Sequence, residues 1–246
     1  MNLRYIALGL DYDTYINSNN ELRYQFQLHT RFISNYFSKK IRKYRFDTKG
    51  VFNMISIALL PENKMKPTRI TSGDVLETYL TFDQKRYEQI KGTEDYSYYL
   101  ELLEQGFIKA SKFKSIPLDT LLKLIEEFKQ GGYKNEWLHK KKRFKEEDLE
   151  VILTCEFTTN YFQLIATINQ ISTKKELARG AVIRTEPDEV LFDKMFKDIY
   201  IDDNIIITDS SDSPRIIIDK GKIFAGKLDF EIRGDKEIQE MLSYNL

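Results

Sequence analysis

Acidic side chains at the end of the first predicted strand are the first candidates for chemistry. Asp11 and Asp13 close the apolar segment RYIALGLDYD, and their spacing of two places both on one face of a strand. Paired carboxylates at a strand end can hold Mg²⁺, which a nuclease or phosphotransferase uses to activate water or phosphate. Glu156 could add a third ligand. A restriction-type nuclease would also need a Glu-x-Lys strand, and the sequence there reads CEF with no lysine. This chemistry is therefore the alternative interpretation and not the favoured one.

The single cysteine and the two histidines give little support for other catalytic chemistry. Cys155 lies on the apolar face of a predicted strand, where a thiol has neither the access nor the lowered pKa of a nucleophile. His29 falls on the apolar face of a predicted helix, and His139 lies far from it in the sequence without metal-ligand spacing. The patterns predict no catalytic residue, no metal and no cofactor.

Phosphate-binding and hydrolase motifs are also missing. The chain has no G-x-x-x-x-G-K-[ST], G-x-G-x-x-G or G-x-S-x-G segment. The segment DSSDS at 209–213 resembles half of a calcium loop, but it lacks the glycine and the final glutamate, so an Asx-rich turn is predicted there.

The segment NEWLHKKKRFKEEDLE at 135–150 carries the strongest binding signal. It contains the only tryptophan and the densest basic run, and the charge inverts directly afterwards. If it is extended, one face carries Trp137, His139, Lys141 and Arg143, while Lys140 and Lys142 project from the other. Such a strand suits the edge of a sheet, where lysines oppose aggregation. The functional interpretation makes these six residues a partner-binding stripe, because tryptophan and arginine are favoured interface anchors.

Composition and charge limit the class of partner. With 246 residues, 41% hydrophobic and 31% charged, the chain can form a substantial core. Its 38 basic and 38 acidic residues give no net charge, whereas non-specific nucleic-acid binding needs a basic excess. No apolar run reaches the length of about 20 residues that spans a bilayer, and no signal peptide is apparent. A protein of the reducing cytoplasm is expected, with a membrane role excluded and nucleic acid disfavoured.

Hydrophobic periodicity predicts an α+β fold with a mixed or antiparallel sheet, several helices and a strand-rich C-terminal half. Helical spacing covers 21–44, 93–107 and 116–132, with Thr93 as an N-cap and Gly106 as a C-terminal stop. Strands are predicted at 4–12 and 51–60, and 149–157 with 161–171 forms a hairpin. A short helix is predicted at 188–200. One domain over 1–246 is preferred, with possible sub-lobes at 1–132, mainly helical, and 133–246, mainly strand.

Three functional hypotheses follow. The leading one is a non-catalytic protein that binds another protein, most concretely an immunity or inhibitor protein that neutralises a bacterial toxin or effector. The alternatives are a metal-dependent nuclease or phosphotransferase using Asp11 and Asp13, and a nucleic-acid-binding module using 137–143. The acidic stretch after the basic run favours a protein partner, since it would repel phosphate. The sequence leaves the oligomeric state open.

Overall fold

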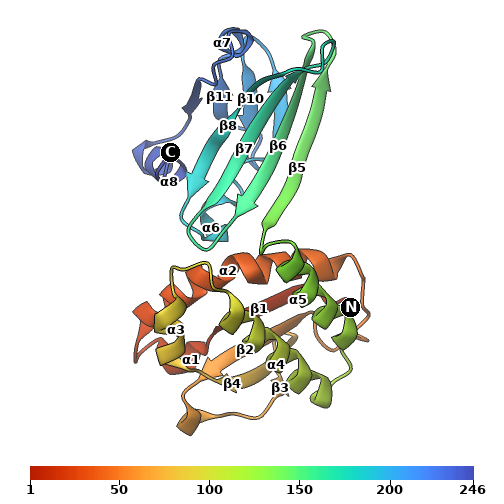
Figure 1. The fold of residues 1–246 in the computed structure, drawn as a ribbon, viewed down its shortest axis with the longest axis vertical. Helices are drawn as coiled ribbons and strands as arrows, with labels where there is room; N and C mark the ends of the chain where they lie inside the picture. Colours follow the sequence, from red (N-terminus) through yellow and green to blue (C-terminus); the bar gives the residue numbers. More distant parts are fainter. The chain divides into compact units, whose positions relative to one another are not determined.

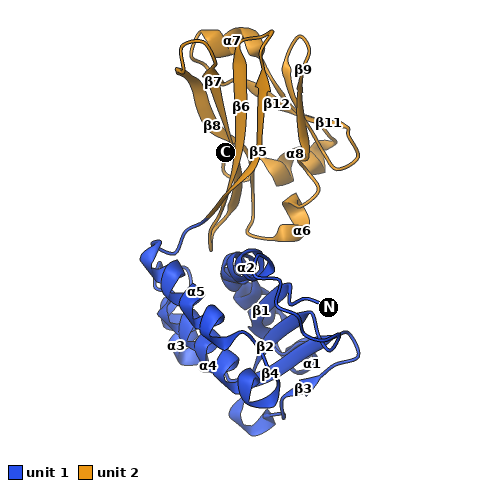
Figure 2. Ribbon diagram, turned by 90° about the vertical axis from the view of Figure 1, so that its right-hand side faces the viewer, with its two compact units in different colours: residues 1–135 blue, residues 136–246 orange.

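The computed structural model describes residues 1–246 and confirms the α+β class. Backbone contacts divide the chain into two compact units, Met1–Asn135 (unit 1) and Glu136–Leu246 (unit 2), each shown in its own colour in Figure 2. The division lies close to the boundary between the possible sub-lobes 1–132 and 133–246. Whether the chain folds as one domain stays a prediction.

Unit 1 is built on a four-stranded sheet in which three strands are parallel. The strand order is β1-β2-β4-β3, with β1, β2 and β4 parallel and the short β3 antiparallel at one edge. The bounds of the strands are β1 Tyr5–Leu10, β2 Met54–Leu60, β3 Arg69–Ile70 and β4 Val75–Thr81. Strands 4–12 and 51–60 were thus correctly predicted, and parallel pairing needs the long crossover that the helix between them provides.

Helix α4 covers one face of this sheet, and α2 lies along its β1 edge (Figures 1 and 2). The longest helix, α2, contacts β1, α4 contacts β1, β2 and β4, and α5 packs on α2 and α4. The bounds of the helices are α1 Tyr12–Tyr15, α2 Asn20–Arg42, the 3₁₀ turn η1 Glu62–Lys64, α3 Gln84–Ile90, α4 Ser97–Phe113 and α5 Leu118–Gln130. The predicted amphipathic helices at 21–44 and 116–132 are confirmed.

The prediction for α4 was wrong at both ends. Tyr96 is the N-cap, and Thr93 instead donates its hydroxyl to the carbonyl of Ile90. Gly106 lies inside the helix and is buried, because a Cβ there would collide with Ile57 of β2. The glycine therefore allows α4 to approach the sheet closely and does not end the helix.

The outer edge of β1 is covered by hydroxyl groups of α2. Ser38 Oγ accepts from Ile6 N at 2.9 Å and donates to Ile6 O at 3.2 Å. One turn earlier, Ser34 Oγ accepts from Leu8 N at 3.3 Å, and Thr30 Oγ1 donates to Leu8 O at 3.1 Å. These hydroxyls take the place of a neighbouring strand, and a helix that covers an edge prevents pairing with another chain.

Unit 2 contains two antiparallel four-stranded sheets that pack face to face (Figures 1 and 2). Their orders are β5-β6-β7-β8 and β12-β11-β10-β9, so each sheet follows the chain from strand to strand. The bounds are β5 Asn135–Phe144, β6 Leu149–Phe157, β7 Phe162–Gln170, β8 Glu176–Thr185, α6 Glu189–Phe192, β9 Asp198–Ile201, β10 Ile205–Thr208, β11 Pro214–Ile218, α7 Lys220–Phe224, β12 Phe230–Ile232 and α8 Lys236–Leu242.

The core of unit 2 confirms the predicted hairpin. Val151, Leu153 and Cys155 are fully buried, and β6 pairs with β7 from Leu149↔Gln170 to Phe157↔Phe162. The predicted helix at 188–200 was too long, because only Glu189–Phe192 is helical and Asp198 already begins β9.

Candidate binding site on the β5–β6 hairpin

Strand β5 is an edge strand, as its mixed pattern predicted, and its first half contributes to the core of unit 2. The ring of Trp137 lies 6.1 Å from that of Phe162, and the ring of His139 lies 4.7 Å from that of Phe196 in an edge-to-face contact. Phe162 is fully buried on the inner face of the sheet. Trp137 and His139 are therefore packing residues on the inner face.

The second half of the basic run has a different orientation. Lys141 Nζ lies 3.0 Å from Glu150 Oε1, and Arg143 Nε lies 2.6 Å from the same oxygen. Glu150 precedes the buried Val151 in β6, so its side chain belongs to the outer face of the sheet.

The prediction that Trp137, His139, Lys141 and Arg143 share one face was consequently wrong. The alternation slips by one residue between His139 and Lys141, as a β-bulge would cause. The first two residues of this stripe turn inward, and the last two turn outward.

Lys140 and Lys142 bind the neighbouring sheet. Both ammonium groups contact Asp198 Oδ1, at 3.2 and 3.5 Å, and Lys142 also donates to the carbonyl of Ile199 at 2.6 Å. The pKa of Asp198 is lowered, first by the hydrogen bond from the backbone of Ile199 and then by the two lysines, although burial opposes the shift. These lysines connect the edges of the two sheets at β5 and β9.

Glu150 organises the outer cations. It is 8% exposed, and the hydrogen bonds from Arg143 and then Lys141 lower its pKa to about 2, against a smaller effect of burial. Two cations share this one carboxylate, and the side chain of Arg143 is 63% exposed with no bonded acceptor other than Glu150. This cluster of the outer face therefore carries one positive charge in excess, held in a fixed orientation.

Apolar residues outside the predicted partner-binding stripe lie between polar groups on this outer face. Leu138, which alternates with Trp137 and His139, is 59% exposed, and Ile152 and Ile165 are half-buried. No helix of unit 2 covers this face, which is turned to the viewer in Figure 1. The alternation of β6 and β7 carried this signal, because every second residue of each strand faces away from the core.

A second polar network closes the other end of the outer face. Glu156 accepts hydrogen bonds from Tyr161 and Gln163, and Gln163 in turn accepts from Arg184 at 2.7 Å. The guanidinium of Arg184 lies 4.9 Å from the centre of the Tyr161 ring. Ile152 lies opposite Thr167 and Ile165 opposite Thr154, so the middle of the outer face alternates isoleucine with threonine between the two polar networks.

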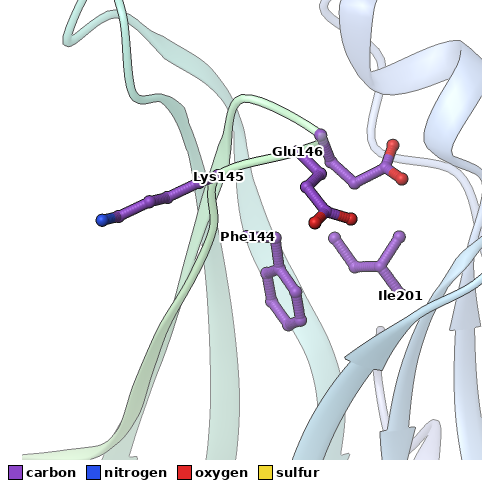
Figure 3. A pocket seen from close by; sticks show the side chains of 5 residues that line it. Phe144, Lys145, Glu146 and Ile201 are labelled. Carbon is purple, nitrogen blue, oxygen red and sulfur yellow. The ribbon is translucent and has the colours of Figure 1, made fainter.

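The turn of the hairpin forms an open hollow of about 280 Å³, lined by residues 144–147 and Ile201. The side chains of Phe144, Glu146 and Ile201 lie on the same side of the turn, whereas Lys145 points away (Figure 3). Glu147 Oε2 is held by Lys220 Nζ at 2.8 Å. The acidic residues Glu146 and Glu147 thus line a hollow at the end of the hairpin, next to the cations of β5.

Asp11, the buried member of the acidic pair, is already bound by protein groups. Asp11 is 4% exposed, caps α1 through Thr14 N and binds Lys66 Nζ with both oxygens at 3.1 Å, while Asp13 is exposed. Burial would raise the pKa of Asp11, but the hydrogen bonds from Thr14 and Lys66 outweigh it and lower the pKa. No group of three or more His, Cys, Asp or Glu side chains could hold a metal ion. No observation therefore favours the metal-dependent alternative.

The remaining sequence candidates have structural roles. His29 Nδ1 lies 3.0 Å from Tyr87 Oη, and burial, followed by the charge of Lys91, lowers its pKa. Asp209 Oδ1 accepts from Ser211 N at 2.8 Å, which confirms the predicted Asx turn.

Comparisons with protein-family models, with curated proteins and with solved structures gave no match for this chain. No helix of the structure has the length and apolar character needed to cross a membrane.

Proposed function

We propose that the protein is a non-catalytic binding protein that contacts another protein through the outer face of the β5–β8 sheet. The observation that carries the proposal is the exposed Leu138, with Ile152 and Ile165, between two ordered polar networks. An apolar centre with a polar rim is the usual anatomy of a protein interface. Because the networks are already formed, binding would order few further side chains.

Charge along the hairpin supports a protein over a nucleic acid as the partner. Lys141 and Arg143 share one carboxylate on the outer face, and Glu146 and Glu147 follow within the same hairpin. A phosphate backbone that bound along the hairpin would be attracted by these cations and repelled by the glutamates a few residues away. A protein surface can match both signs, and such complementarity gives specificity.

The most specific form of the proposal is an immunity or inhibitor protein that occludes a bacterial toxin or effector in the cytoplasm. It predicts that the captured partner has a damaging activity that this protein suppresses at a stoichiometric ratio. The balanced charge and the ordered surface are its support.

The test compares Leu138→Glu with the matched control Val190→Glu. Both replace an exposed apolar residue of unit 2, and Val190 lies on α6 with 78% exposure. The tagged full-length proteins would serve as bait in lysate of the source cells. We expect a single stoichiometric protein with the wild type and the control. Leu138→Glu should weaken binding at least about tenfold, since burying a leucine is worth about 1.5–3 kcal/mol. Equal capture by both variants, or nucleic acid alone that salt removes, would contradict the proposal.

A further inference from the structure

The hollow at the turn of the β5–β6 hairpin combines an apolar floor with a carboxylate that no other residue neutralises. Phe144 and Ile201 form the apolar part, and Glu146, which is exposed, lies on the same side of the turn without a hydrogen bond or ion pair to another residue (Figure 3). Glu147 differs, because Lys220 neutralises it at 2.8 Å. The lining of the hollow therefore holds one carboxylate without a bonded partner, that of Glu146, beside an aromatic ring.

The ring of Phe144 already interacts with a cation of the protein itself. Lys142 Nζ lies 5.6 Å from the ring centre, within the range of a cation–π contact. The only lysine that lines the hollow, Lys145, points away from it (Figure 3), so no basic side chain of the lining competes for Glu146. The ring therefore accepts a cation beside it, and the unpaired carboxylate of Glu146 supplies the negative charge that a cationic ligand needs.

We propose that this hollow receives the arginine side chain of a partner protein; this inference rests on the proposed protein-binding function. A guanidinium is planar, so it can stack against Phe144 while its fork of N–H groups donates to the carboxylate of Glu146. Its alkyl stem would cover Ile201. The volume of about 280 Å³ lies just below the range of roughly 300–1,000 Å³ of ligand pockets, which suits one side chain better than a larger molecule.

The probe for the test is N-acetylarginine N-methylamide, and its neutral isostere N-acetylcitrulline N-methylamide is the ligand control. Each would be titrated into the ¹⁵N-labelled full-length chain by NMR. The variant is Glu146→Gln, matched by Asp203→Asn, which removes an exposed carboxylate from the neighbouring β9–β10 turn. Neither side chain is buried, so both variants should fold.

We expect the arginine probe to shift the amides of 144–147 and Ile201 and to bind more tightly than the citrulline probe. Glu146→Gln should weaken binding about two- to fivefold, the range of an exposed ion pair, while Asp203→Asn leaves it unchanged. Equal binding of both probes, or equal effects of both variants, would overturn the inference. The titration needs no partner, so its failure is separate from a failure of the Leu138→Glu comparison.

Discussion

Replacing Ser38 with alanine tests whether the hydroxyls of α2 hold the edge of the parallel sheet. Ser38 is 8% exposed and Ile6 is 2% exposed, and one hydroxyl satisfies both the N–H and the C=O of Ile6. Ser38→Ala would leave both backbone groups buried without this partner. An unsatisfied buried group costs about 1–3 kcal/mol, and some water can reach this edge, so we expect a loss of about 2 kcal/mol.

The matched control is Ser111→Ala, which removes an exposed hydroxyl that donates to its own helix, α4, at Ile108 O. Both substitutions gain the same helix propensity of about half a kcal/mol, so their difference isolates the contact with β1. Urea unfolding followed by circular dichroism would measure stability, and hydrogen exchange would report the amide of Ile6. If Ser38→Ala matches Ser111→Ala in both measurements, the hydroxyls do not stabilise the edge and the reasoning fails.

Three further predictions concern the two units. The pKa of Glu150 is lowered to about 2, so its contribution to stability is complete above pH 4.5 and is lost as the pH falls toward 2. Unfolding would be followed by tryptophan fluorescence at pH 5 and at pH 3. Between these pH values the free energy of unfolding of Glu150→Gln should fall by about 1 kcal/mol less than that of the wild type, after allowance for the exposed partners of Glu150. Gly106→Ala should destabilise by about 1–3 kcal/mol through collision with Ile57, while Gly9→Ala, with open space around it, should not; thermal melts of both variants decide this. Burial lowers the pKa of His29, so its contribution to stability should be complete above pH 6.5 and should fall at lower pH, where the unfolded chain takes up a proton more readily than the folded one. His29→Gln should therefore reduce the slope of the unfolding free energy against pH between pH 7.5 and 5.5.

The sequence by itself determined the class of fold and its strongest elements. The helical spacing in α2 and α5 and the alternation in β6 and β7 each expose one apolar stripe, and such a stripe must be buried whatever covers it. The same logic correctly placed Cys155 in the core and β5 at an edge. Local patterns were sufficient here because each of these elements buries one face, and the spacing of its own apolar residues shows which face that is.

The tertiary structure alone decided which residues meet. Gly106 looks like a helix end in the sequence, and only the position of Ile57 shows why it lies inside α4. The candidate surface exists because β5 changes phase, which turns Trp137 inward and leaves Arg143 on the outer face with Glu150. Hydrophobic periodicity cannot reveal such a slip, because the slip depends on contacts between segments and not on the spacing of residues within one segment.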